Sequence, residues 1–355
     1  MACFQATMSL SPGTRLEHYD GGSALHLAKR CPAPPKWHGN ATVWRFARRT
    51  PGSRATSWAT LLLVVFLSGC SGGVAPEPSV SGSPPEASFD ATDALAEVLT
   101  FHASFDDGID ADWALGDRQI YTAPSYAEQD QAVPGIGNPA VGVADGAGRF
   151  GRALRFTARN QHAIFYKADR NVGYSSEDWS GTVSFWLSLD PAADLEPGFC
   201  DPIQITDAAY NDAAIWVDFT AENPRQFRLG VFGDLDAWNP DGLSPDEHPG
   251  FLDRLVIVDE PPFETGRWTH VVITYSGLNT QMGGVATLYL DGVPQPDVAD
   301  GIDEPFTWDP ARGAIRLGVN YVGLFDEVSL FSRALTDEEV RALHVLEGGA
   351  AALHP

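Results

Sequence analysis

The sequence predicts an all-β protein, a sandwich or barrel of short strands. Many short runs of alternating apolar and polar residues, rich in β-branched and aromatic side chains, are separated by Gly, Pro, Asp and Asn. The pattern contains one convincing helix, at the C-terminal end, whereas an α/β fold would alternate helices with strands. The composition and the patterning therefore both favour a β fold with a small helical addition.

The strands are expected, in chain order, at 95–105, 153–156, 163–166, 182–189, 203–205, 213–219, 226–232, 268–275, 286–290, 313–319 and 324–331. In the last of these, strict alternation places Asp326 on one face and Glu327 on the other, so neither face is purely apolar. The helix that follows begins with a capping box, in which Thr336 and Glu339 each satisfy a backbone N–H of the other. Its apolar stripe is formed by Val340, Leu343 and Leu346.

Two stretches, 121–148 and 233–265, are longer than a hairpin turn. Loops beyond about fifteen residues are often functional. The second half of 233–265 has apolar anchors and is expected to pack, whereas its first half sets Trp238 among acidic residues. We expect this loop to cover one edge of a binding face with Trp238 as its contact residue; the alternative is that Trp238 is a buried peg that holds the loop down.

The segment before residue 70 predicts export. Arginines 45, 48, 49 and 54 precede an apolar run at 58–67, which is too short to span a membrane and is typical of a secretory signal. Leu67-Ser68-Gly69-Cys70 resembles a bacterial lipobox, which implies cleavage before Cys70 and acylation of its thiol. The alternative is a buried helix that ends in a cysteine. Residues 1–44 lie unusually far upstream and indicate a mis-assigned start or a long leader.

These features predict a leader and signal at 1–69, a flexible Pro/Ser/Gly tether at 70–92, one domain at 93–347 and a tail at 348–355. From residue 70 onward 15 Lys and Arg oppose 45 Asp and Glu, a net charge of 15 − 45 = −30. Such a surface repels nucleic acid and anionic lipid, so neither is an expected partner. Cys200 is the one cysteine of the domain, which therefore has no internal disulfide and depends on its core.

Two blocks of the sequence resemble the LamG-like, concanavalin A-like jelly-roll family. The run from Phe325-Asp326-Glu327-Val328 through Arg333 to Glu338-Glu339 resembles the closing strand and terminal helical turn of that family. The segments 267–275 and 286–292 resemble its central hairpin. The resemblance covers roughly residues 99–346. It implies a two-sheet antiparallel jelly roll, and it implies a biochemical activity only weakly.

Signals of catalysis are weak in the sequence. Jelly-roll glycoside hydrolases place carboxylates at period-2 spacing on one strand face, and no such run is found. Neither a Gly-x-Ser-x-Gly elbow nor a His-Glu-x-x-His motif occurs. The domain is therefore expected to bind rather than to cut.

The candidate ligand-binding residues are Trp216, Asp218, Trp238, Asn239, Asn320 and Tyr321. Jelly-roll lectins stack aromatic faces on pyranose rings and hold hydroxyl groups with Asn, Asp or Arg. In 213–219, alternation predicts that Trp216 and Asp218 share the face opposite three apolar neighbours. Packing is the alternative role for each tryptophan. The prediction requires that these aromatic residues meet in one exposed concavity.

The family resemblance also implies a calcium ion that clips the turn after the first strand to the last strand. Ca²⁺ takes six to eight oxygen ligands, from carboxylates and carbonyls. Asp106 or Asp107, together with Asp326, are the expected ligands. The alternative is that 106–108 is an ordinary turn and Asp326 accepts backbone hydrogen bonds.

Taken together, these features predict an exported lipoprotein of the bacterial cell envelope, periplasmic or at the cell surface, held to the membrane by its lipid anchor alone. Its LamG-like domain is expected to bind a polysaccharide or glycoprotein. Two alternatives remain open: an envelope adhesion or structural protein that binds another protein, and a diverged polysaccharide hydrolase or lyase.

Overall fold

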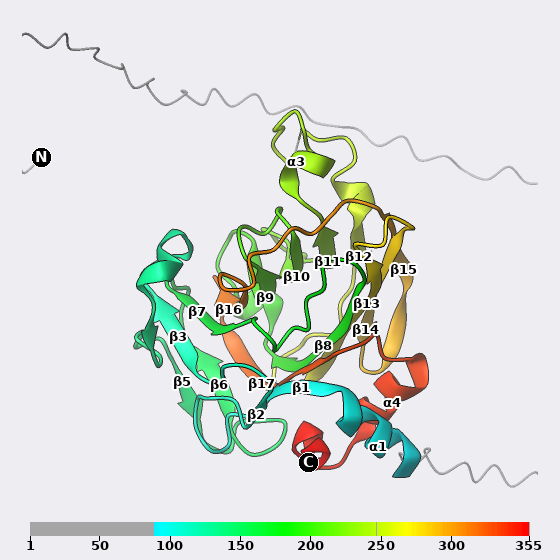
Figure 1. Cartoon of the computed structure of the whole chain (residues 1–355). Coiled ribbons are helices and arrows are strands. Elements are labelled where there is room, and N and C mark those ends of the chain that lie inside the picture. The colour runs from blue at the N-terminus through cyan, green and yellow to red at the C-terminus, as the bar shows by residue number, and fades with distance from the viewer. Residues whose placement is uncertain (1–88, 246, 355) are drawn as a thin grey trace, which may run out of the picture. The chain divides into compact units, whose positions relative to one another are not determined.

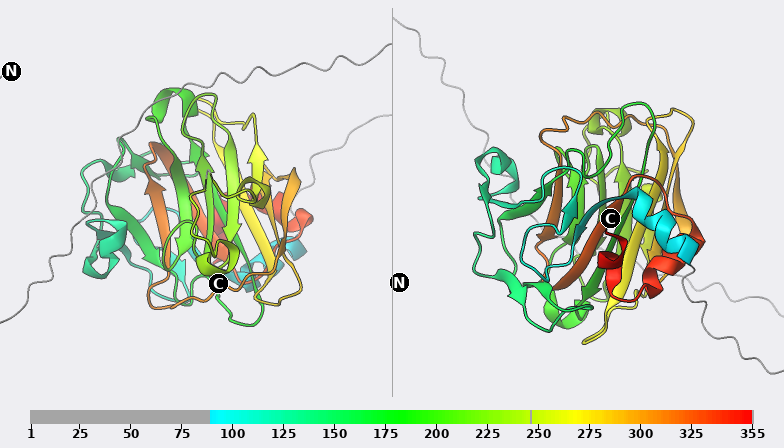
Figure 2. Two further views of the ribbon diagram at one scale, coloured as in Figure 1. Left: turned by 90° about the horizontal axis from the view of Figure 1, so that it is seen from above. Right: turned by 60° about the horizontal axis from the view of Figure 1, so that its bottom comes forward.

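The computed structural model describes residues 89–245 and 247–354, which lie in one compact unit. The predicted leader, Cys70 and most of the tether fall outside the described residues. Within them, strands form two antiparallel sheets packed face to face, as Figures 1 and 2 show. The predicted class, a two-sheet antiparallel jelly-roll sandwich, is confirmed.

Sheet A has nine strands, ordered β15-β14-β13-β8-β17-β1-β2, with β6 on β17 and β5 on β6. Its members are β1 (Leu99–Ala103), β2 (Trp113–Ala114), β5 (Val141–Ala144), β6 (Ala153–Phe156), β8 (Trp179–Ser188), β13 (Thr269–Leu278), β14 (Gly284–Leu290), β15 (Val293–Ile302) and β17 (Gly323–Phe331). Sheet B has eight strands, ordered β12-β11-β10-β9-β16-β7-β3-β4. Its members are β3 (Ile120–Ala123), β4 (Val133–Pro134), β7 (Ala163–Lys167), β9 (Cys200–Thr206), β10 (Ala214–Phe219), β11 (Phe227–Phe232), β12 (Leu255–Val258) and β16 (Ala314–Val319).

Short helices decorate this sandwich. They are α1 (Phe89–Val98), α2 (Pro191–Asp194), α3 (Leu235–Trp238) and α4 (Asp337–Val345), with 3₁₀ turns η1 (Tyr126–Gln131), η2 (Leu252–Arg254) and η3 (Gly349–Leu353). The predicted capping box of α4 is confirmed, because Thr336 and Glu339 exchange both hydrogen bonds. No helix in residues 89–354 is long and apolar enough to cross a membrane.

The core lies between the sheets and follows the predicted alternation. In β8, Val183, Phe185 and Leu187 point inward and are fully buried. In β10, Ile215, Val217 and Phe219 do the same, which leaves the alternate side chains on the outer face of sheet B, as predicted.

The structure differs from the predicted segments at several places, which include the added strand β15 and the elements η1, β4 and β5 within 121–148. A helix, α1, occupies 89–98, where a tether and then a strand were expected, because its Ala- and Leu-containing sequence forms an apolar face against α4 (Figure 1). Residues 349–353 of the predicted tail form η3, whose Ala350 and Leu353 are buried in the same cluster. The long stretch 233–265 contains α3, η2 and strand β12.

Strand β17 breaks the alternation that the sequence predicted for it. A bulge lies between Asp326 and Ser329 in the pairing with β8, and Glu327 has a left-handed φ of 54°. The extra residue places Phe325 and Val328, three positions apart, on the same core-facing side. Asp326 and Glu327 are thereby both kept out of the apolar core, which corrects the prediction of one acid on each face.

The two outer faces of the sandwich differ in their cover. On sheet A, the helices α1 and α4 and the turn η3 pack over Val272, Tyr289 and Phe331. On sheet B, two small apolar clusters lie apart. One joins Trp216 to the 233–255 loop, and the other surrounds Phe165, next to η1. Between these clusters the outer face of sheet B is polar.

Candidate functional site

We call this polar part of sheet B the polar strip and define it by Asp201, Gln204, Asp218, Arg228 and Arg316. Its residues come from four adjacent strands, β16, β9, β10 and β11. The sheet register sets Arg316 beside Gln204 and Asp218 opposite Arg228. These side chains take the outward positions of strands whose inward positions form the core. The alternation of the sheet therefore builds the strip, apart from Asp201 at the register shift of β9, and packing leaves its five side chains only 3% to 9% exposed.

An ion pair fixes the centre of the strip. Arg228 Nε donates to Asp218 Oδ1 at 2.8 Å, and Arg228 Nη2 donates to Asp218 Oδ2, so the guanidinium grips the carboxylate with two parallel bonds. The ring of Phe199 lies over the same guanidinium, with 5.1 Å from Cζ to the ring centroid. Phe199 is 52% exposed. A solvent-facing aromatic ring thus rests on a rigid charged support.

A second carboxylate lies beside this pair. Asp201 accepts a hydrogen bond from Gln204 Nε2. Burial, followed by the negative charge of Asp218, raises the pKa of Asp201 to about 8, although Gln204 and Arg228 act in the opposite direction. Burial also raises the pKa of Asp218, while its bonds with Arg228 lower it. The bonds of Arg228 thus support the negative charge of Asp218, whereas burial and that charge both disfavour the ionised form of Asp201.

One end of the strip is closed by a chain of hydrogen bonds. Asn320, just after β16, donates from Nδ2 to the carbonyl of Phe199 at 3.4 Å. Its Oδ1 accepts from Arg159 Nε at 2.9 Å, and Arg159 Nη1 donates to the Pro197 carbonyl at 3.0 Å. This network fixes the backbone that carries Phe199 and brings Arg159 to the rim.

The other end of the strip meets η1. Arg316 donates to Gln129 Oε1 from Nε at 3.3 Å and from Nη2 at 3.1 Å, and it lies over the ring of Tyr126. Burial lowers the pKa of Arg316. Burial likewise raises the pKa of Tyr126, whose hydroxyl has no hydrogen-bond partner in the described part of the chain. The strip therefore ends, beside η1, in the guanidinium of Arg316 and a Tyr126 hydroxyl that has no hydrogen-bond partner among the described residues.

The structure separates the predicted ligand-binding residues. Trp216 is 2% exposed, between Gly230, Phe232 and Tyr210, and its Nε1 donates to the Tyr210 carbonyl. Tyr321 is fully buried in the main core. The expectation that these rings meet in one exposed concavity is wrong, because flanking loops cover Trp216 and the sandwich interior takes Tyr321.

The 233–265 loop holds the other two predicted residues. Trp238 is 4% exposed and packs on Phe232 and Phe251, and its Nε1 donates to the Asn211 carbonyl at 2.9 Å. Asn239 is also buried, and both ends of its amide bond the backbone of Leu243. Trp238 is therefore a peg and not an exposed contact residue. Of the six predicted residues, Asp218 and Asn320 do belong to the polar strip or its rim.

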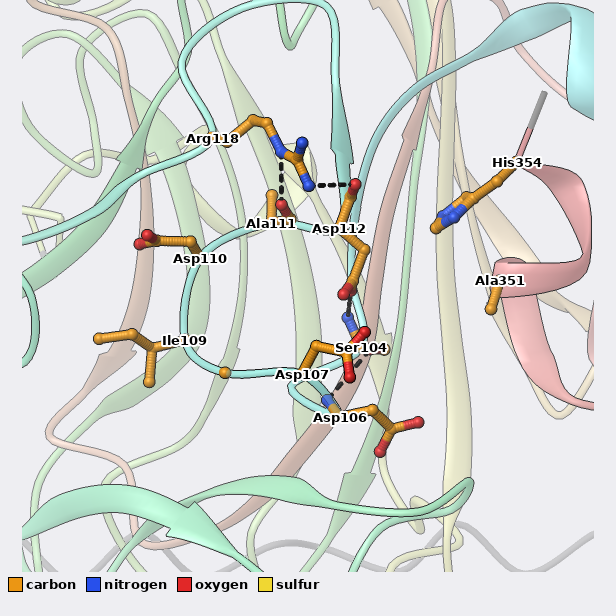
Figure 3. Close-up of a pocket in the computed structure, with 11 residues that line it drawn as sticks. Ser104, Asp106, Asp107, Ile109, Asp110, Ala111, Asp112, Arg118, Ala351 and His354 are labelled. Carbon is orange, nitrogen blue, oxygen red and sulfur yellow. Dashed lines mark hydrogen bonds between the residues drawn. The ribbon is translucent and has the colours of Figure 1, made fainter.

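A separate acidic cavity of about 630 Å³ lies where β1 ends (Figure 3). Its acidic lining comes from Asp106, Asp107, Asp110 and Asp112. Figure 3 shows His354 and Ala351 facing this loop from the C-terminal segment. Ser104 N donates to Asp112 Oδ2 at 2.7 Å, and Arg118 Nε donates to the Ala111 carbonyl at 2.8 Å. These bonds hold the loop in its curved form.

The predicted calcium ligands fit a metal only in part. Asp106 Oδ1 accepts a hydrogen bond from Arg152 N at 2.6 Å, and Asp326 Oδ2 accepts one from Phe150 N at 3.1 Å. Both carboxylates therefore contact the loop of residues 150–152. Asp107 is exposed and lines the acidic cavity, which Asp326 does not. Burial raises the pKa of Asp326 to about 8. In residues 89–245 and 247–354, no group of three or more His, Cys, Asp or Glu is arranged to hold a metal ion, so backbone carbonyls would have to complete a site.

Sequence reasoning missed Phe199, Asp201, Arg228 and Arg316 as members of one surface. The pairing of Asp218 with Arg228 could have been predicted from the sequence, because opposite charges occupy outward positions of two consecutive predicted strands. Asp201 and Phe199 gave no such signal, since they lie at the start of β9 where the register shifts between Val217 and Phe219. A bulge cannot be read from alternation alone.

Residues 168–341 match the family model Laminin_G_3, the concanavalin A-like lectin/glucanases superfamily. The match supports a concanavalin A-like lectin/glucanase domain. The strands before residue 168 extend this domain, because β1 pairs with β17 and β7 pairs with β16. No curated protein matches the chain.

Solved structures with a similar fold are remote in sequence. Domain 4 of AbnA, a GH43 extracellular arabinanase from Geobacillus stearothermophilus in complex with arabinotriose, shares 19% identity at a TM-score of 0.43, over 69% of this chain and 97% of that chain. The binding domain of botulinum neurotoxin DC in complex with SialylT shares 10% identity at a TM-score of 0.46, over 70% of this chain. The present chain covers 52% of the length of that toxin chain. These likenesses concern the fold and carry no argument about a ligand.

Proposed function

We propose that this domain is a non-enzymatic binding module for carbohydrate and that the sugar binds at the polar strip of sheet B. The observation that carries the proposal is Phe199, a half-exposed ring held on the Asp218–Arg228 pair. Sugar rings present apolar C–H faces to aromatic rings and hydroxyl groups to polar side chains. Asn320 provides such a side chain next to Phe199, and Gln204 provides another on the same face of the sheet. The superfamily description, which names lectins and glucanases, is in keeping with a sugar ligand.

Replacement of Phe199 by alanine is expected to weaken glycan binding at least tenfold while leaving the melting temperature nearly unchanged. The ring is 52% exposed, so little core packing is lost. A glycan array followed by calorimetry on the best ligand measures the effect. Met282→Ala is the matched control, because Met282 is 86% exposed in the turn between β13 and β14. Equal binding by Phe199→Ala and the native chain would place the sugar elsewhere.

The buried acids favour one second candidate, a diverged polysaccharide hydrolase. Asp201 and Asp218 are neighbouring buried carboxyl groups whose pKa values are both raised by burial, and the bonds of Arg228 favour the charged form of Asp218, as in an acid–base pair with distinct roles. The bidentate grip of Arg228 argues against this role, because it occupies both oxygens of Asp218. If the purified domain released reducing ends from mixed polysaccharides, the result would favour the hydrolase over the binding module.

We also propose that the domain is exported and anchored through an acylated Cys70, on the basis of the lipobox-like sequence. Cys70→Ala is expected to abolish lipid labelling, because the thiol is the acceptor. Cells fed a clickable palmitate analogue report this directly, with Cys200→Ala, a change at a buried thiol, as the control. Equal labelling of the Cys70 variant would rule out this anchor.

Calcium remains a proposal for the loop that Asp106 and Asp326 share. If these carboxylates hold the ion, a chelator is expected to lower the melting temperature and added Ca²⁺ to restore it, because a ligand of the folded state stabilises it by mass action. Asp326→Asn should abolish the response. Asp107→Asn should keep it, since the carboxylates of Asp106 and Asp326 accept hydrogen bonds from the 150–152 backbone and that of Asp107 does not. A melting curve that ignores the chelator would exclude the site.

A further inference from the structure

We propose that the sugar recognised at the polar strip is anionic, carrying carboxylate or sulfate groups that the arginines of the strip and its rim bind. This inference rests on the proposed function and adds the chemical class of the ligand. Its starting point is three guanidinium groups on one face: Arg159 at the rim, Arg228 at the centre and Arg316 beside η1.

Each of these arginines keeps one donor nitrogen free of partners in the described part of the chain. Arg159 uses Nε and Nη1 on Asn320 and Pro197, which leaves Nη2. Arg228 uses Nε and Nη2 on Asp218, which leaves Nη1. Arg316 uses Nε and Nη2 on Gln129 and Ala208, which also leaves Nη1. All three side chains are held by their other bonds, so the free donors are oriented before a ligand arrives. Arg159 is partly exposed, whereas Arg228 and Arg316 are 7% and 3% exposed, so Arg159 offers the most accessible of these donors.

The acids around these arginines do not neutralise them. Asp218 is matched by Arg228 alone. Burial and the charge of Asp218 raise the pKa of Asp201, which disfavours its negative charge. Asp207, which follows β9, acts on Arg316 without forming an ion pair with it, and its Oδ2 accepts a hydrogen bond from Asp309 N at 2.8 Å. Arg159 and Arg316 have no carboxylate within ion-pair distance among the described residues. The strip is thus locally cationic on a chain segment whose net charge is −30, by the count of 15 − 45 from residue 70.

The chemistry of guanidinium favours oxyanions over hydroxyl groups. A planar fork of N–H donors matches the two oxygens of a carboxylate or sulfate, and charge-assisted hydrogen bonds are about twice as strong as neutral ones. A neutral sugar would leave these donors bonded only to hydroxyl oxygens. A sugar acid can place its ring on Phe199, which lies over Arg228, and its charged group on Arg159, which Asn320 links to the Phe199 backbone.

The test compares each acidic glycan with its own neutral form. Oligosaccharides of galacturonan, alginate and hyaluronan are titrated by calorimetry at pH 7 and low salt, beside the same chains after reduction of their carboxyl groups. Dextran sulfate and dextran form the sulfate arm. At least one acidic form is expected to bind about tenfold or more tightly than its neutral partner, a difference that follows from one charge-assisted bond. Binding confined to dextran sulfate would assign the ligand as a sulfate ester.

Variants distinguish recognition of an anionic sugar from carbohydrate binding in general, the proposed function on which this inference rests. Arg159→Gln is expected to weaken binding of the acidic form about tenfold more than binding of the neutral form, because both forms lose the support of the Phe199 backbone and only the acidic form loses a charged partner. Arg341→Gln, which removes the same charge from an exposed position on α4, should change neither. Equal affinity for acidic and neutral forms would overturn the anionic class and keep carbohydrate binding. Failure of the native chain to bind any glycan would overturn both.

Discussion

Replacement of Trp238 by alanine is expected to destabilise the domain by about 3–5 kcal/mol, the usual cost of removing a large buried aromatic side chain. The indole packs against Phe232 and Phe251 at centroid distances of 5.0 and 6.1 Å, and His248 meets its ring edge-on at 4.9 Å. Its N–H also bonds the Asn211 carbonyl. The substitution therefore removes apolar contacts and leaves a backbone acceptor without its donor. Urea denaturation followed by intrinsic fluorescence and circular dichroism measures the loss.

The control for this substitution is Leu243→Ala in the same loop, because Leu243 is 37% exposed and should cost well below 1 kcal/mol. Glycan affinity of the Trp238 variant, measured below its unfolding transition, should stay close to that of the native chain. If Trp238→Ala were as stable as the native chain but bound glycan more weakly, the indole would be a ligand-binding surface, and its assignment as a buried anchor of the loop would be wrong.

The strands were predictable because the apolar side chains alternate with the period of a strand. β10 is the clearest case: Ile215, Val217 and Phe219 face the core and the intervening Trp216 and Asp218 face outward, as the sequence indicates. The prediction was weaker where alternation is interrupted. Glu327 adds one residue to β17, and a rule of period two cannot foresee the extra residue.

The candidate site was less predictable than the fold because an outward position is not necessarily an exposed one. Trp216 faces outward, yet the 233–255 loop and Tyr210 cover it. Cover by a loop depends on contacts between segments distant in sequence, which local patterning does not encode. Phe199 shows the converse, since its position before β9 gives no periodic signal and only the fold sets it over Arg228.

The protonated acid of the polar strip has a measurable consequence for stability. Burial and the charge of Asp218 raise the pKa of Asp201 to about 8, from 3.8 in the absence of these effects. Between these two values the folded chain binds a proton that the unfolded chain has released. Stability must therefore fall as the pH rises from about 4 to about 8, by at most about 1.4 kcal/mol for each pH unit.

Asp201→Asn is expected to flatten this dependence, because the amide is neutral at every pH and its Oδ1 can still accept the hydrogen bond from Gln204 Nε2. The free energy of unfolding, measured in urea at pH 5 and pH 8, should fall less in the variant than in the native chain. Other buried groups, such as Asp326, titrate in both proteins and cancel in this difference. Asp241→Asn, the same chemical change at an exposed loop position, should leave the native dependence in place. Parallel pH curves for the native chain and Asp201→Asn would mean that Asp201 is ionised in the fold, and the cationic character of the polar strip would then be reduced by one charge.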